Sequence, residues 1–388
     1  MNLKEKDKQY IVGSYGRFPL EIVKGKGSLC WDENGKEYID LGAGIAVNAF
    51  GFCDDEWTAA VKAQLDTLQH TSNLYYTEPC VSLAEMLCER SGMSKVFFSN
   101  SGAEANECAI KAARRYAFRK YGDESHSTII TLKNSFHGRT VTTLSATGQD
   151  SFHEEFGPFT QGFLYAEPND TEGMLRLISE NDCAAVMMEM VLGEGGVLTL
   201  DPDFVKATVE AARAKDMLIV VDEVQTGNGR TGALYAYMHY GFTPDIFSTA
   251  KGLGGGLPIG ATLFSKKTEN VYTPGTHGST FGGNPIACAG AVSVISRIND
   301  QLLAEVKEKS DYIIQELSSA KGVKAVSGKG LMLGIACDRP AKEVISGCME
   351  NGVLVISAKD KVRLVPALNI PMDLLEKAIA VLKEELAK

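Results

Sequence analysis

Short apolar runs alternate with longer helical patterns through the middle of the chain. The apolar runs lie at residues 96–98, 128–132, 184–188, 218–221 and 246–249. Amphipathic helical periodicity follows at residues 103–120 and 203–214. The second helical stretch is preceded by Asp201-Pro202, an N-cap residue followed by proline at the first helical position. This alternation predicts an α/β fold with a mostly parallel central sheet.

The two ends of the chain carry other patterns. Near the N-terminus, Asn34-Gly35 separates two short apolar runs, which predicts a β-hairpin. Helical patterns follow at residues 56–68 and 79–89, and further ones lie at 285–298, 302–319 and 371–386. Strand candidates in the C-terminal part are residues 331–336, 353–356 and 362–365. We therefore expect a large domain at 56–284, a smaller α+β domain at 285–388, and an N-terminal segment, 1–55, that joins the smaller domain.

Composition and charge narrow the classes of function. The chain has 388 residues, of which 44% are hydrophobic and 23% charged, as in ordinary globular proteins. Its net charge of −10 repels polyanions, so a nucleic-acid partner is not expected. The longest uncharged apolar stretch has about ten residues, against the ~20 of a membrane helix, so no membrane partner is expected either.

The cysteines and the N-terminus indicate where the protein works. Nine cysteines are scattered without metal-knuckle spacing, which predicts neither a disulfide framework nor a bound metal. Residues 1–9 mix charges of both signs and lack the apolar core of a signal peptide. We therefore expect a cytoplasmic protein with reduced cysteines.

Candidate chemistry gathers after the predicted strands, where open α/β sheets bind ligands. After the first strand, Ser101 and Glu104 form an S-x-x-E capping box at the start of a helix. The free backbone N–H groups and the dipole of such a helix start favour an anion such as phosphate. An ordinary capped helix is the alternative.

Three further strand ends carry reactive or binding side chains. Phe136 and Arg139 follow the second strand, where an aromatic can stack on a ring and an arginine can clamp a carboxylate. Asp222 ends a buried apolar run and must find a partner. Lys251 ends another, where desolvation lowers the pKa of an amine and makes it nucleophilic. Each of these residues also has an ordinary alternative. Phe136 can belong to the core and Arg139 to the surface. Asp222 can form a structural ion pair, and Lys251 can be solvated.

Together, the four strand ends indicate one cofactor. They match a ligand with a phosphate, an aromatic ring, a ring nitrogen and an aldehyde, and pyridoxal 5'-phosphate has all four. Such a cofactor is bound through a lysine Schiff base, with a carboxylate opposite the pyridine nitrogen.

Longer motifs resemble the class III aminotransferases over nearly the whole chain. The matching stretches are N-S-G-A-E-A-N (100–106), F-H-G-R (136–139), G-E-G-G (193–196), D-E-V-Q-T-G-N-G-R-T-G (222–232), K-G-L-G-G-G-L-P-I-G (251–260) and H-G-S-T-F-G-G-N-P (277–285). The resemblance implies the fold type I architecture of pyridoxal-phosphate transferases, with a large domain around a mostly parallel sheet and a smaller α+β domain.

The resemblance also implies how the cofactor is held. Lys251 is then the Schiff-base lysine and proton shuttle, and Asp222 keeps the ring nitrogen protonated. The other implied cofactor contacts are Ser101, Gly102 and Ala103 at the phosphate, Phe136 on the ring face, Gln225 near the ring hydroxyl, and Thr280 from a neighbouring subunit. Many relatives carry threonine in place of Ala103, so one hydroxyl contact is absent here. A shared site makes a homodimer obligatory.

The substrate contacts implied by the resemblance come from four side chains. Arg139 binds the α-carboxylate, and Ser279 lies beside the substrate. Glu194 masks Arg363 in one half-reaction and releases it in the other to bind an α-carboxylate. A simple turn residue between glycines is the alternative for Glu194.

Length and the A-Y-M-H-Y-G stretch (236–241) are most similar to the family members that transfer the δ-amine of N-acetyl-ornithine to 2-oxoglutarate in arginine biosynthesis. Ornithine, succinyl-ornithine, succinyl-diaminopimelate and 4-aminobutyrate remain alternative amine donors.

Two hypotheses from other classes compete with this one. Residues 227–232 fit G-x-G-x-x-G after a strand, with Asp245 further on, as in a nicotinamide dehydrogenase. However, residues 222–226 separate the first glycine from the strand, whereas the fingerprint belongs directly on a strand-to-helix turn. A non-catalytic dimer that keeps the fold is the other alternative, although every candidate catalytic position is filled.

Overall fold

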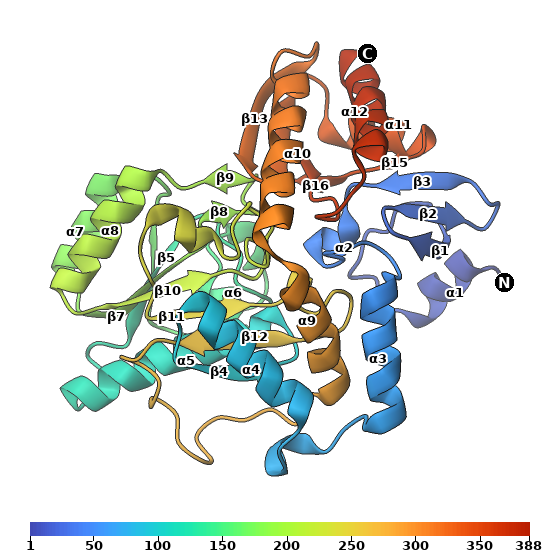
Figure 1. The fold of residues 1–388 in the computed structure, drawn as a ribbon. Coiled ribbons are helices and arrows are strands. Elements are labelled where there is room, and N and C mark those ends of the chain that lie inside the picture. Colours follow the sequence, from blue (N-terminus) through green and yellow to red (C-terminus); the bar gives the residue numbers. More distant parts are fainter.

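A computed structural model describes residues 1–388 and has a seven-stranded sheet at its centre (Figure 1). The strand order is β4 (Lys95–Ser99), β12 (Gly260–Phe264), β11 (Ile246–Thr249), β10 (Leu218–Asp222), β7 (Cys183–Met188), β5 (Thr128–Leu132) and β6 (Phe163–Ala166). β12 runs antiparallel to both of its neighbours, and the other pairs are parallel. The expected mostly parallel sheet is confirmed.

Helices cover both faces of this sheet, so its central strands are apolar throughout. In β10, Leu218 and Val220 pack in a cluster with α5 (Gly102–Tyr121). Ile219 and Val221 point to the other face, where α7 (Thr171–Glu180) and α8 (Pro202–Ala214) contribute to a larger cluster. The continuous burial of β7 and β10 is typical of parallel strands covered on two sides.

A second sheet brings the two ends of the chain together. Its order is β1 (Ile22–Lys26), β2 (Leu29–Asp32), β3 (Glu37–Asp40) and β15 (Val353–Leu354). The expected hairpin joins β2 to β3, with Gly35 at φ 80° and the carboxylate of Asp32 accepting the N–H groups of Asn34 and Lys36. β15 pairs in parallel with β3, so the N-terminal hairpin and the C-terminal part share one sheet.

The expected single strand at residues 353–356 was wrong. The structure divides this stretch between β15 and β16 (Ile356–Ala358), which belong to different sheets. β16 pairs with β17 (Lys361–Leu364) in a sheet completed by β13 (Val323–Lys329) and β14 (Met332–Cys337). The chain bends at the buried Val355 because one straight strand cannot pair with both β3 and β17.

The remaining elements surround these sheets. They are α1 (Leu3–Tyr10), α2 (Ala43–Ala46), α3 (Asp55–Thr67), α4 (Glu78–Ser91), α6 (Val141–Ala146), α9 (Pro285–Arg297), α10 (Asp300–Ser318), α11 (Ala341–Glu350), α12 (Met372–Ala387), the small ladder of β8 (Val191–Leu192) and β9 (Leu198–Thr199), and the 3₁₀ turns η1 (Ser72–Leu74), η2 (Asp150–Phe152), η3 (Ala236–Tyr240) and η4 (Lys251–Leu253). No helix has the length and apolar character needed to span a bilayer. The division at residues 55 and 284 stays a prediction.

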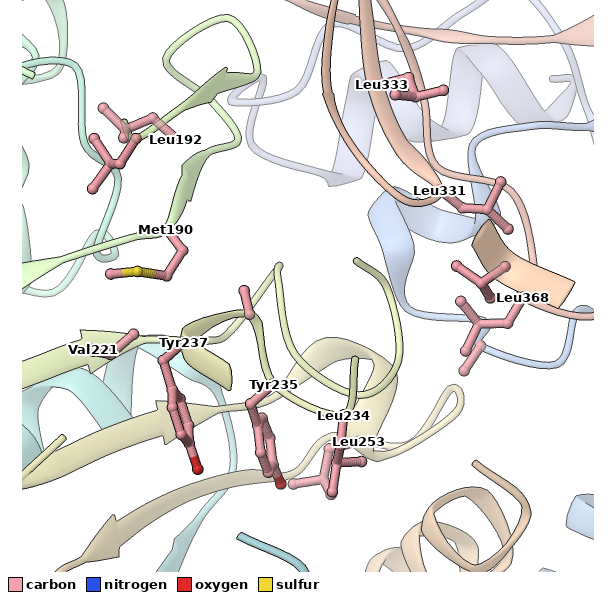
Figure 2. Packing of buried hydrophobic residues seen from close by; sticks show 14 of the residues in the cluster. Met190, Leu192, Val221, Leu234, Tyr235, Tyr237, Leu253, Leu331, Leu333 and Leu368 are labelled. Atoms are coloured by element: carbon pink, nitrogen blue, oxygen red, sulfur yellow. The ribbon is translucent and has the colours of Figure 1, made fainter. Parts of the chain in front are cut away.

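One hydrophobic cluster of 63 buried residues connects the central sheet to the C-terminal part of the chain. Figure 2 shows a portion of it, with Val221 and Tyr237 beside the central sheet and Leu331 and Leu368 across from them. This continuous core holds the ends of the central strands in place relative to β14 and β17.

A substitution at Gly260, the first residue of β12, tests how closely β12 approaches the start of α5. A Cβ atom at this position would lie 2.3 Å from the backbone oxygen of Ser101 and 2.6 Å from Oγ of Ser99. We expect Gly260→Ala to lower the free energy of unfolding by about 1–3 kcal/mol, as overpacking does, measured by urea denaturation. Gly13→Ala, at a position with nothing within 4 Å, is the control. Equal stability of the two variants would contradict this tight approach.

Candidate active site

A cavity of about 560 Å³ opens at the carboxyl ends of the central parallel strands. Its lining includes the following residues predicted from the sequence: Ser101, Gly102, Ala103, Phe136, Arg139, Asp222, Gln225 and Lys251. The structure therefore brings together the side chains that follow β4, β5, β10 and β11. Their convergence is a consequence of parallel strands ending at one edge.

The start of α5 forms one end of the cavity. Ser101 is the N-cap, and its side chain accepts the N–H of Glu104. The carboxylate of Glu104 turns back to the N–H of Asn100, one residue before the N-cap. As first-turn residues, Gly102 and Ala103 have N–H groups without an intrahelical acceptor, which favours an anion here. A Cβ at Gly102 would lie 2.6 Å from Cγ1 of Val224, so any other residue here would force Val224 to shift.

Asp222 is the most tightly held side chain of the site. One carboxylate oxygen accepts Nδ1 of His137 at 2.8 Å and Nδ2 of Asn106 at 2.7 Å, and the aspartate is 3% exposed. Burial alone would lower the pKa of His137, but the hydrogen bond and charge of Asp222 raise it. Sequence reasoning gave His137 and Asn106 no role, although both lie in the quoted motifs.

Lys251 follows β11 with an amine that forms no hydrogen bond to the protein. Burial lowers its pKa, and the charge of Arg363 acts in the same direction, against the opposing charges of Glu194 and Asp222. Its backbone φ of 45° is left-handed, a conformation that costs a non-glycine residue about 1–3 kcal/mol. An amine with a lowered pKa is a better nucleophile.

Phe136 and Arg139 lie on the turn after β5. The guanidinium of Arg139 is 4.5 Å from the ring centroid of Phe152 and 5.7 Å from that of Phe136. No carboxylate lies within salt-bridge distance of Arg139, which is exposed. Arg139 is therefore a free cation at the cavity, available for a carboxylate ligand.

Arg363 is a second cation, and it is masked. Only 3% of its side chain is exposed, and its guanidinium donates to Glu194 at 2.6 and 3.3 Å and to Oε1 of Gln225 at 3.0 Å. Burial would raise the pKa of Glu194, but the charge of Arg363 lowers it below its ordinary value. Neither Glu194 nor Arg363 lines the cavity directly; Gln225 connects the pair to it.

Ser279 and Thr280 are not brought to this cavity. They lie on the loop between β12 and α9, beside a separate hollow that includes Glu104, Glu107 and His277. Oγ of Ser279 bonds the side chain of Asn100 and the N–H of Gly282, whereas Thr280 is exposed.

Tyr15 and Glu189 also line the cavity and were also missed by sequence reasoning. Tyr15 reaches the cavity from the irregular segment after α1, and no pattern in the sequence marked it. Glu189 directly follows β7, at the level where Asp222 ends the neighbouring β10. The rule that strand ends carry ligand-binding groups, applied to β7, finds it.

The glycine-rich stretch at residues 227–232 lacks the structure of a dinucleotide site. It lies in turns after β10, and the next regular element is the 3₁₀ turn η3, not an α-helix. The helix start required to bind a pyrophosphate is therefore absent.

Comparison with known proteins identifies the family. A family model described as "Aminotransferase class-III" matches residues 10–386. The chain belongs to the class III aminotransferase family.

Individual class III aminotransferases match the chain over most or all of its length. The acetylornithine aminotransferase of Haemophilus ducreyi is 46% identical over 388 residues, covering 100% of this chain and 98% of its own. The succinylornithine transaminase of Photorhabdus laumondii is 43% identical over 371 residues, covering 93% and 92%. The ornithine aminotransferase structure from Toxoplasma gondii, described with partial occupancy of PLP at its active site, has a TM-score of 0.94 and 32% identity, covering 99% of this chain and 93% of its own.

The cavity of this class III aminotransferase has a donor set that fits pyridoxal phosphate. A helix start with free N–H groups lies at one end, and the buried carboxylate of Asp222 lies deeper. The amine of Lys251 is unpaired, and Phe136 lines the same space.

The buried pair of Glu194 and Arg363 predicts a pH-dependent contribution to stability. The pKa of Glu194 is lowered from its ordinary value of 4.5, so the stabilisation is present above that value and is lost as the pH falls through the folded-state pKa. We expect Glu194→Gln to lower the free energy of unfolding by about 1–3 kcal/mol at neutral pH. This difference in the free energy of unfolding between wild type and variant should shrink as the pH falls below the ordinary pKa of glutamate, 4.5.

We would measure this effect by urea denaturation of the wild type and of Glu194→Gln. The two measurements are made at neutral pH and at a pH well below the pKa of Glu194. Glu210→Gln, an exposed glutamate of α8 without an ion-pair partner, is the matched control. The same deficit at both pH values would show that the charge of Glu194 is not what stabilises Arg363.

Proposed function

We propose that the protein transfers the δ-amine of N-acetyl-ornithine to 2-oxoglutarate with pyridoxal phosphate, giving N-acetyl-glutamate 5-semialdehyde and glutamate. The observation that carries this proposal is one cavity with an unpaired lysine and a buried aspartate, flanked by one free and one masked arginine. The Haemophilus relative is named for this activity. The reaction is a step of arginine biosynthesis, and the cytoplasm is its expected location.

The chain's own residues divide the work around the cofactor. When bound, the cofactor supplies an aldehyde that takes up the amine and a ring that withdraws electrons. Asp222, held by His137 and Asn106, keeps a proton on the ring nitrogen. The amine of Lys251, with its lowered pKa, takes and returns the proton that moves at the substrate carbon.

The two arginines explain how one site accepts two unlike substrates. In each substrate, one carboxylate lies at the end away from the reacting carbon, and Arg139 binds this carboxylate. Glu194 neutralises Arg363 while N-acetyl-ornithine presents its terminal amine. When Glu194 turns away, Arg363 binds the α-carboxylate of 2-oxoglutarate, which lies next to the reacting carbon. A buried arginine without a partner is costly, so a carboxylate must occupy it in each half-reaction.

A homodimer completes the site in this proposal. Thr280 is exposed and lies outside the cavity of its own chain, so we place it at the cofactor phosphate of a second copy. Asn73 bonds the backbone of Ser279 and Gly282, which joins η1 to this loop. The exposed apolar side chains nearby are those of Leu74, Tyr75, Tyr76 and Phe281, and a cluster of this kind is typical of an interface.

Replacement of Lys251 tests the chemistry. We expect Lys251→Ala to lose transaminase turnover by a factor of at least ~10³, because no other amine lines the cavity. The purified, cofactor-loaded wild type should absorb near ~420 nm and bleach with hydroxylamine, and the variant should lack this band. Lys62→Ala, at an exposed helical position, is the control. Retained turnover in Lys251→Ala would exclude the proposed role.

The acyl group is tested by substrate comparison. Steady-state kcat/KM for ornithine, N-acetyl-ornithine and N-succinyl-ornithine should be highest for the acetyl form, by about tenfold or more over free ornithine, because the free α-amine carries a charge that must be desolvated. The succinyl form is the closest competitor, since the Photorhabdus relative is named for it. Equal values for ornithine and its acetyl form would refute the assignment.

A further inference from the structure

Glu189 is a buried carboxylate that the proposed mechanism does not use. It follows β7 and lies beside Asp222, because Met188 pairs with Val221 in the parallel ladder. It is 5% exposed, lines the cavity and has no ion-pair partner. Burial and the charge of Asp222 raise its pKa to about 7, against the opposing charge of His137.

The two carboxylate oxygens of Glu189 hold two different segments of the site. Oε1 accepts the backbone N–H of Phe136 at 2.8 Å, and Oε2 accepts that of Gly193 at 3.4 Å. Phe136 is the aromatic lining residue after β5, and Gly193 directly precedes Glu194. The side chain of Glu189 therefore connects the segment that carries Phe136 to the turn that carries Glu194, the partner of Arg363.

The turn around Gly193 is packed closely enough to transmit a shift. A Cβ at Gly193 would lie 2.5 Å from Oε1 of Gln225 and 2.8 Å from Cε of Met332. The same oxygen of Gln225 accepts the guanidinium of Arg363. Arg363 also donates to the backbone oxygen of Gly193 at 3.4 Å. A displacement of Gly193 therefore acts on all three acceptors of Arg363, which are Gly193, Glu194 and Gln225.

We propose that Glu189 is a positioning residue that couples the Phe136 side of the cofactor site to the Glu194–Arg363 pair. The inference rests on the function proposed above. A carboxylate suits this task because it offers acceptor oxygens to two N–H donors at once. A residue needed only to fill the core would not require the desolvation of a carboxylate that has no ion-pair partner.

Glu189→Gln is the sharpest single change. The amide keeps one acceptor oxygen and turns an NH₂ group toward the other N–H, so one of the two bonds is lost. We expect the affinity of the apoprotein for pyridoxal phosphate to fall about tenfold, measured by titration of protein fluorescence. At saturating cofactor, the KM for 2-oxoglutarate should fall several-fold with kcat changed less, because a loosened Glu194 competes less for Arg363.

A double-mutant cycle separates coupling from general damage. In a Glu194→Ala background, Glu189→Gln should no longer change the KM for 2-oxoglutarate, since no carboxylate remains to be released. The loss of cofactor affinity should persist, because it acts through Phe136. Additive effects on KM, or unchanged cofactor affinity in both backgrounds, would overturn the proposal.

Glu223→Gln is the matched control. Glu223 is equally buried, its pKa is also raised to about 7, and its carboxylate accepts the N–H of Tyr237 and the hydroxyl of Thr226 away from the cavity. We expect it to leave the KM for 2-oxoglutarate unchanged. An equal effect of Glu223→Gln would reduce Glu189 to a structural role.

The cofactor titration also distinguishes the two hypotheses. A wild type that binds pyridoxal phosphate but transfers no amine would refute the proposed function, while the titration of Glu189→Gln still tests the coupling to Phe136. An active wild type with an unaffected Glu189→Gln would refute this inference alone. If Glu189→Gln does not fold, Glu189→Asp, with two oxygens but a shorter reach, should show the same changes to a smaller degree.

Discussion

The buried carboxylate of Asp222 is the constraint on which the rest of the site depends. A charge at the end of a fully apolar strand is tolerated only with partners, and His137 and Asn106 provide them from two other elements. These partners fix both the position and the hydrogen-bonding direction of the aspartate. The cavity, the lysine on the neighbouring strand end and the start of α5 are arranged around this point.

Some charged groups of the site have an ion-pair partner and others have none, and this arrangement suits a transaminase. Lys251 is unpaired and its pKa is lowered, Arg139 is a free cation, and Arg363 is paired with Glu194. Glu189 is the one lining carboxylate held by backbone N–H groups alone. In the proposed function, Arg139 and Arg363 bind the carboxylates of the substrates, although the protein as a whole is acidic.

Much of the central layer could be read from the sequence because its signals are local. The runs at 128–132 and 246–249 match β5 and β11, and Asp201-Pro202 starts α8. β12 was missed because its residues begin inside a glycine-rich motif, and it is the one strand that runs against its neighbours. The sequence analysis also missed β6, β13, α1, α6, α7 and α11. The stretch at 353–356 was misread because its division depends on pairing with β3 and β17, far away in the chain.

By itself, the sequence determined which chemical groups follow the central strands, because strand periodicity and the parallel arrangement place strand ends at one edge. It also determined the family, through motifs that run the length of the chain. The resemblance also implied that Glu194 pairs with Arg363 and that Thr280 serves a neighbouring subunit. Only the tertiary structure decided how deeply Arg363 is buried and that Glu189 joins Phe136 to Gly193. These contacts depend on how the C-terminal sheet and the loops dock on the central layer, and such docking follows from the shape of the shared core.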